Sequence, residues 1–129
     1  MVENDQKYQY WLKGALEDLE VAKILADKRK VRHSLYFGHL VLEKILKSCI
    51  SKSSGNIPPR IHNLLRLSEM IGLELTVEQT DLLSEMNVFN LAGRYPDVLE
   101  EFPDFKEVKC YLNKIEEMVR WLINQFFNP

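Results

Sequence analysis

Apolar residues recur at intervals of three and four along most of the chain, which is the spacing of one face of an α-helix. The first stripe comprises Tyr8, Leu12, Ala15, Leu19, Ala22 and Ala26, and Trp11, Ile24 and Leu25 are expected to widen it. The basic run 28–30 should close this helix, because cations suit a helix C-terminus. A second stripe comprises Leu35, Leu42, Ile45, Leu46, Cys49 and Ile50. The polar tract 51–56 and the two prolines that follow it predict the main loop.

Three further helices are expected after this loop. A short one should run from about His62 to Ile71, with Gly72 as its stop. Capping-box spacing predicts that a fourth helix begins at Thr76 and ends before Pro96. The same spacing opens the last helix at Asp104, and its stripe comprises Val108, Leu112, Ile115, Val119, Leu122 and Phe126. The pattern predicts one all-α domain over residues 1–129, an up-and-down bundle of four long helices plus one short helix.

The amino-acid composition agrees with the prediction of a single globular domain. The 129 residues are 46% apolar and 28% charged, which is typical of a globular domain. No apolar run approaches the roughly 20 residues that span a bilayer, and the N-terminus lacks the apolar stretch of a signal peptide. Cys49 and Cys110 show no Cys-x-x-Cys spacing and are expected to be free thiols that fill helix faces. We therefore expect a cytoplasmic protein without membrane contact.

The net charge of −2 conceals an uneven distribution. Residues 1–22 carry a net −3 and residues 67–129 a net −7, whereas residues 23–66 hold ten basic and two acidic side chains, a net +8. All three histidines also lie in the basic segment. This segment is therefore where an anionic partner would be expected to bind.

Several catalytic signatures are missing. The five glycines are isolated, so the chain has neither a P-loop nor a dinucleotide-binding fingerprint. No Glu-x-x-His occurs, which disfavours a ferritin-like metal bundle. His39 and Glu43 share a helix face at i, i+4, but no further ligand is evident, and a partly buried, locally hydrogen-bonded histidine is the simpler interpretation. No metal and no cofactor are expected.

Two clusters of side chains suggest binding. The first contains Lys44, Lys47, Lys52, Arg60, His62 and Arg66. Its lysines share a helical face, and its Arg60 and His62 lie where free N–H groups at a helix start would favour phosphate. A merely solvated basic face is the alternative. In the second cluster, Arg94 and Tyr95 could pair with a phosphate and stack on a base. An ordinary helix end before Pro96 is the simpler explanation there.

Four ordered stretches carry a resemblance to a known family. They are 15–19 (Ala-Leu-Glu-Asp-Leu), 42–47 (Leu-Glu-Lys-Ile-Leu-Lys), 59–64 (Pro-Arg-Ile-His-Asn-Leu), and Asn90 with 94–97 (Arg-Tyr-Pro-Asp). In this order they resemble the HEPN domain family of small helical bundles, over roughly residues 8–126.

The resemblance implies a dimer of bundles, often encoded beside a minimal nucleotidyltransferase, and contact with nucleotide or RNA. The positions that match family motifs are Glu43, Lys44, Lys47, His62, Arg94 and Tyr95. Ribonuclease members of the wider family carry an Arg followed four to six residues later by a His near the start of a late helix. Here no histidine follows His62, and Arg29 with His33 lies at a predicted helix junction. The resemblance therefore argues against catalysis.

The leading hypothesis is a non-catalytic HEPN-type bundle that binds nucleotide or phosphate and pairs with a minimal nucleotidyltransferase, as in a toxin–antitoxin pair. Its candidate binding residues are Lys44, Lys47, Arg60, His62, Arg94 and Tyr95. Two alternatives stay open. One is a metal-independent toxin ribonuclease that uses His62 with Arg60 or Arg94, and the other is a purely structural dimerising adaptor.

Overall fold

The computed structural model describes residues 2–128, with side chains from residue 7 onward. The helices are α1 (Val2–Asp27), α2 (Val31–Ser54), α3 (Leu64–Met70), α4 (Val77–Arg94), the 3₁₀ turn η1 (Pro96–Val98) and α5 (Phe105–Phe126). Residues 2–128 contain no strand. The prediction of an all-α bundle with four long helices and one short helix is confirmed. None of the described helices is both long and apolar enough to span a membrane.

Local sequence signals set most of the helix ends. Both capping boxes form: Thr76 and Gln79 exchange bonds of 3.1 and 3.0 Å, and Asp104 and Glu107 exchange bonds of 2.8 and 3.5 Å. Gly55 ends α2 in the left-handed conformation, with φ of 73°. Such a backbone suits glycine, which has no Cβ to clash. The two capping boxes form where the sequence predicts them, whereas α2 continues through residues 51–54 of the tract that was predicted to be loop.

Two details differ from the prediction. Helix α3 begins at Leu64 and not at His62, because the Asn63 side chain caps it by accepting bonds from the N–H groups of Leu65 and Arg66. The turn η1 was not predicted; it forms where Pro96 ends α4 and its fixed φ starts a new turn.

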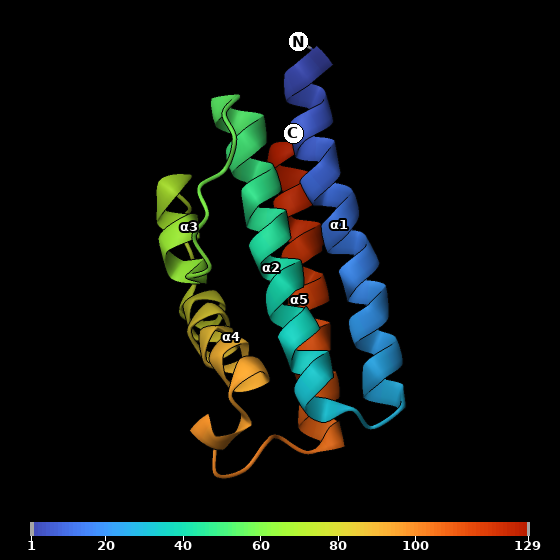
Figure 1. Ribbon diagram of the computed structural model, residues 1–129. Helices are drawn as coiled ribbons and strands as arrows, with labels where there is room; N and C mark the ends of the chain where they lie inside the picture. The colour runs from blue at the N-terminus through green and yellow to red at the C-terminus, as the bar shows by residue number, and fades with distance from the viewer. Residues whose placement is uncertain (1, 129) are drawn as a thin grey trace.

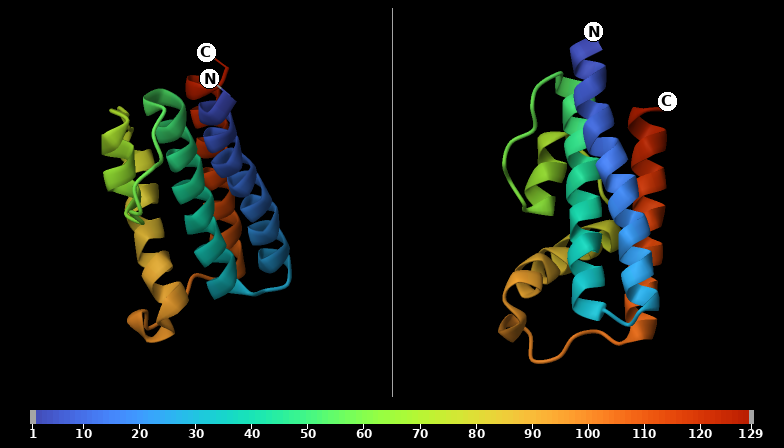
Figure 2. Two further views of the ribbon diagram at one scale, coloured as in Figure 1. Left: turned by 45° about the horizontal axis from the view of Figure 1, so that its top comes forward. Right: turned by 45° about the vertical axis from the view of Figure 1, so that its right-hand side comes forward.

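Helices α1, α2 and α5 lie side by side, and α4 packs on the other side of α2 (Figures 1 and 2). Helix α3 and the loop before it cover the upper part of α2 and α4 (Figure 1). The two ends of the chain lie at the same end of the bundle (Figure 1), where the rings of Tyr8 and Phe127 stack at 5.1 Å. Helix α2 is therefore the central element, with neighbours on both sides.

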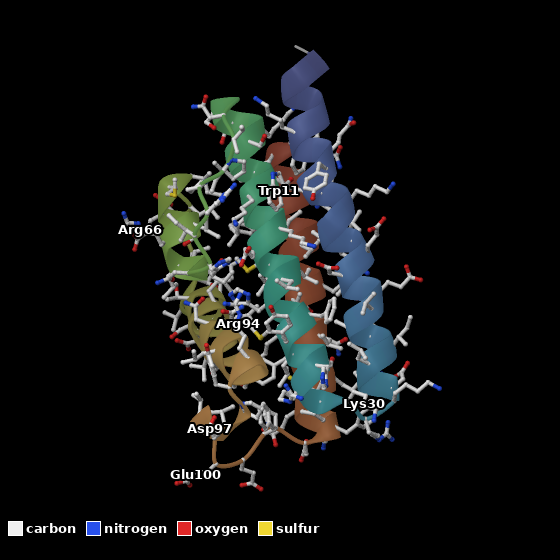
Figure 3. The ribbon with its side chains drawn as sticks, viewed as in Figure 1. Trp11, Lys30, Arg66, Arg94, Asp97 and Glu100 are labelled. Atoms are coloured by element: carbon white, nitrogen blue, oxygen red, sulfur yellow. The ribbon has the colours of Figure 1, made fainter. Side chains whose placement is uncertain are left out.

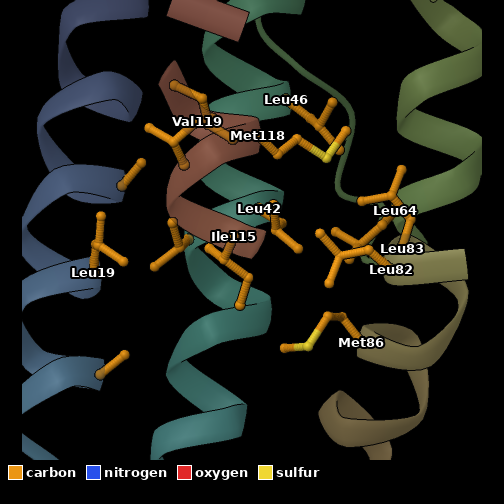
Figure 4. Packing of buried hydrophobic residues seen from close by; sticks show 14 of the residues in the cluster. Leu19, Leu42, Leu46, Leu64, Leu82, Leu83, Met86, Ile115, Met118 and Val119 are labelled. Atoms are coloured by element: carbon orange, nitrogen blue, oxygen red, sulfur yellow. The ribbon is translucent and has the colours of Figure 1, made fainter. Parts of the chain in front are cut away.

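The core follows the predicted stripes. Leu42 and Leu46 of α2 lie between Ile115 and Met118 of α5 and the leucines of α3 and α4 (Figure 4). Two sequence assignments were wrong. Ile24 is 52% exposed, and Cys110 is exposed rather than buried like Cys49. Both lie at the edge of an apolar stripe, where spacing alone cannot separate core from surface. Phe126 is half-buried and packs against the core, as its place in the last stripe predicts.

Gly93 of α4 lies directly against Tyr36 of α2. A Cβ at this position would overlap the Tyr36 ring. The Arg32 guanidinium also donates a 2.8 Å bond to the Gly93 carbonyl oxygen. The absence of a side chain therefore allows the last turn of α4 to lie against the start of α2.

Candidate functional site

Glu43 lies at the centre of a polar cluster in the middle of α2. Its carboxylate is buried, with 5% of the residue exposed. Oε2 accepts a 3.1 Å bond from Lys47 Nζ, and Oε1 accepts a 3.0 Å bond from His62 Nδ1. The i, i+4 spacing puts Glu43 and Lys47 on one face of α2, while the loop before α3 supplies His62. A buried carboxylate is thereby paired on both of its oxygens.

His39, one turn earlier on α2, is completely buried. Its Nε2–H donates to the His62 backbone carbonyl at 3.0 Å, and its Nδ1 accepts from Asn90 Nδ2 at 3.2 Å. Burial is the main cause that lowers the pKa of His39 to about 4. The Glu43 carboxylate opposes this shift, and the positive charge of Arg94 acts in the same direction as burial. The imidazole is therefore neutral at pH 7. The sequence predicted a locally satisfied histidine, but its partners come from other elements, and Glu43 Oε1 stays 3.8 Å away.

The loop that carries His62 is held in place on both sides of this residue. Pro58 is buried, and the Leu64 N–H donates to Asn87 Oδ1 at 2.9 Å. Asn87 Nδ2 also donates to Asn63 Oδ1 at 3.1 Å. The His62 ring bonds through Nδ1, and 54% of its side chain remains exposed. Its second ring nitrogen, Nε2, is thus available for a ligand.

The start of α3 does not offer the free N–H groups that were expected to bind phosphate. Asn87 and Asn63 accept from the N–H groups of Leu64, Leu65 and Arg66. This expectation was wrong because neighbouring amide side chains already occupy these donors. Any anion bound here must be held by side chains.

Two of the three lysines of α2, Lys44 and Lys47, have acidic partners. Lys44 Nζ lies 2.6 Å from Asp18 Oδ2 of α1, and its side chain is 29% exposed. Lys47 is almost fully buried, and its Nζ lies over the Trp11 ring, 5.3 Å from the centroid. The predicted shared face of these lysines is therefore the face toward α1, not the His62 loop.

The remaining predicted residues lie near the ends of α2, α3 and α4. Arg60 is exposed in the loop two residues before His62. Arg94 is exposed at the end of α4, beside α2, whereas Arg66 lies on the outer side of α3 (Figure 3). Tyr95 is 59% exposed and caps α4 through a bond from its N–H to the Leu91 carbonyl oxygen. Lys52 lies apart, with Nζ 4.6 Å from the Tyr8 ring centroid.

Sequence reasoning named His62, Arg60 and Arg94 as candidate binding residues, and these stay predictions. It did not assign roles to Asn87 and Asn90. The buried part of the cluster could have been predicted from the sequence, because His39, Glu43 and Lys47 follow one another at intervals of four residues on one face of α2. Among side chains the structure describes, no three His, Cys, Asp or Glu residues gather as metal ligands. Burial also raises the pKa of Cys49 to about 12, so its thiol stays protonated.

This arrangement has a defined chemical capacity. A buried carboxylate on Nδ1 fixes the ring orientation and tautomer of a histidine, and it supports positive charge on the ring. His62 Nε2 can then donate a hydrogen bond to an anion or exchange a proton with a hydroxyl group. Exposed arginines in the same region add charge and two parallel donors each, which suits phosphate oxygens.

Comparison with known proteins bears on this site. Residues 8–125 match the HEPN domain family, which covers nearly the whole chain and confirms the resemblance seen in four sequence stretches. Searches among curated proteins and among solved structures found no match.

Proposed function

Since the chain belongs to the HEPN domain family, we propose that it is a non-catalytic bundle that binds the phosphate of a nucleotide or of RNA at His62. The observation that carries this proposal is the His62 ring, which is half exposed and held through Nδ1 by the buried Glu43. The ring is fixed before a ligand arrives, so binding costs little side-chain entropy. Arg60 and Arg94 would supply the opposing charge.

Calorimetry with ATP, GTP and a short RNA tests this proposal. Wild-type protein should bind at least one of them, and His62→Gln or Arg94→Gln should weaken binding about tenfold, because each removes one charged or oriented contact. Lys106→Ala, an exposed cation on α5, is the matched control and should bind like wild type. Absence of heat with all three ligands would contradict the proposal.

We further propose that the protein forms a homodimer and pairs with a minimal nucleotidyltransferase, as in a toxin–antitoxin system. Family membership supports this, and so does an exposed apolar strip at the end of α4 and in η1, formed by Val88, Leu91, Tyr95 and Val98. Apolar patches of this kind often mark interaction surfaces. Co-expression with the neighbouring gene product, followed by purification and light scattering, should give a complex of defined mass. Two monomers that elute separately would contradict it.

A second function, a metal-independent ribonuclease, is favoured by the same His62–Glu43 contact of 3.0 Å. A carboxylate-oriented imidazole could take the proton of an RNA 2′-hydroxyl, whose oxygen would then attack the adjacent phosphorus. A 2′,3′-cyclic phosphate forms as the bond from phosphorus to the 5′-oxygen of the next nucleotide breaks, and this 5′-oxygen leaves with a proton from water. A gel assay with wild type and His62→Ala separates the two functions. Cleavage that disappears on substitution would replace the binding role with catalysis.

A further inference from the structure

A second recess lies between α1 and α2, on the far side of Lys47 from Glu43. It has a volume of about 300 Å³ and is lined by Tyr10, Trp11, Lys13, Gly14, Glu17 and Lys44. Tyr10 is 71% exposed, so its ring is accessible from solvent. This recess plays no part in the packing of the core.

The two aromatic rings of the recess are held in a fixed arrangement. Tyr10 meets Trp11 edge-on, with centroids 5.2 Å apart and planes at 83°. The indole is fixed in turn by Lys47, whose ammonium lies over it. Such an edge-on pair leaves aromatic surface open to a further planar group, which is how bases stack on proteins that bind single strands.

The floor of the recess is kept open by a glycine. A Cβ at Gly14 would lie 3.2 Å from Lys44 Cδ and would narrow the space beside this side chain. Asp18 holds Lys44 Nζ at 2.6 Å, so the lysine stem forms a fixed wall. Lys13 and Glu17 place one charge of each sign at the rim.

We propose that this recess is a nucleobase-binding subsite, in which a base stacks against Tyr10 while the phosphates of the same ligand pass over the buried Glu43–Lys47 pair toward His62. This inference rests on the proposed phosphate site. Lys47 links the two places, since its Nζ contacts both Glu43 and the Trp11 ring. The mixed charges at the rim can meet the donors and acceptors of a base edge, whereas a purely apolar ligand would leave them unpaired.

The test compares ATP with tripolyphosphate, which has the same phosphate chain and no base. Wild-type protein should bind ATP about tenfold more tightly, because stacking of one base contributes on that order. Tyr10→Ala should remove this preference and leave tripolyphosphate binding unchanged. Tyr10→Phe, which keeps the ring, should retain it. Ile24→Ala, which truncates another exposed side chain of α1, is the matched control.

A spectroscopic measurement reports directly on the recess. In a Trp121→Phe background, Trp11 is the remaining tryptophan, and its fluorescence should change with ATP but not with tripolyphosphate. Equal affinity of wild type for the two ligands, or an unchanged preference in Tyr10→Ala, would overturn the subsite. Failure of both ligands to bind wild type would instead overturn the phosphate site itself.

Discussion

A series of polar side-chain contacts joins α4, α2 and the loop before α3. It runs from Asn90 through His39 to the His62 backbone, and from the His62 ring through Glu43 to Lys47. Each polar side chain in this series of contacts has a hydrogen-bond partner. The series therefore specifies how α4, α2 and the loop before α3 pack together. Loss of one member leaves its neighbour buried without a partner.

The titration of His39 should make stability depend on pH. Its pKa is about 4 in the folded protein, against 6.5 for the unperturbed residue, so the unfolded chain binds the proton more tightly. Stability is therefore unaffected above pH 6.5 and falls as the pH drops from 6.5 toward 4, by up to about 3 kcal/mol. Urea denaturation at pH 7 and pH 4.5 should show a smaller decrease for His39→Gln than for wild type. His33→Gln, at an exposed site, should behave like wild type.

Removal of the Glu43 carboxylate should destabilise the protein, because it leaves a buried charge without its partner. Glu43→Ala leaves the Lys47 ammonium buried without its acid, and we expect the free energy of unfolding to fall by about 3–5 kcal/mol. The double variant Glu43→Met with Lys47→Met should recover most of this loss. Asp27→Ala breaks an exposed pair with Lys109 and should cost less than about 1 kcal/mol. Equal effects of Glu43→Ala and Asp27→Ala in urea denaturation would contradict this account.

These residues also show what sequence alone could predict. His39 and Glu43 were picked out because they are four residues apart on one helix. Their decisive partners, His62 and Asn90, lie 19 residues from Glu43 and 51 residues from His39, respectively. Helical spacing carries no information on contacts of that range, since they depend on how whole helices pack.

At the scale of elements, the contact between α2 and α4 depends on a missing side chain. An exposed Gly→Ala change inside a helix usually stabilises a protein by about 0.5–1 kcal/mol. At Gly93 the added methyl group would overlap Tyr36, so packing and propensity oppose each other.

We expect packing to prevail, with Gly93→Ala lowering the free energy of unfolding by about 1–3 kcal/mol. In a Tyr36→Gly background the same change should be neutral or stabilising, because the ring and the Cβ atom that obstruct it are both gone. Thermal denaturation of the four proteins measures this coupling directly. Ser84→Ala, on the exposed side of α4, controls for propensity alone. Additive effects of the two changes would disprove the contact.

The helix ends with capping boxes could be predicted from the sequence, because a capping box depends only on local residues. The Thr76 and Asp104 capping boxes involve residues only three apart, so the short segment that contains them determines them. The start of α3 was misplaced by two residues because Asn87 and Asn63 decide it jointly, and Asn87 belongs to another helix.

For the whole molecule, the basic segment 23–66 does not form one continuous face. Lys30 lies at the lower end of the bundle, whereas Arg66 lies on the outer side of α3 (Figure 3). Lys44 and Lys47 are paired with acids. Charge along the sequence pointed to the loop that carries His62, but folding divides the segment and leaves few cations near this residue.

Binding of RNA should therefore depend only weakly on salt. Two phosphate contacts, by Arg60 and Arg94, predict a slope of log K against log salt concentration of about −1.4 for a single strand. Fluorescence anisotropy of a labelled RNA at several salt concentrations measures it, and Arg94→Gln should halve the slope. A slope several times steeper would indicate an extended basic surface and contradict this picture.

The common location of the two ends of the described chain, marked by the stacked rings of Tyr8 and Phe127, has a consequence for protein architecture. If the domain were part of a longer polypeptide, the flanking segments could join it at neighbouring points on one end of the bundle. The contact between α1 and α5 would then stay intact. Domains with adjacent ends tolerate insertion and circular permutation well. The same geometry would let this unit be transplanted into a surface loop of a host protein and still present its His62 loop to solvent.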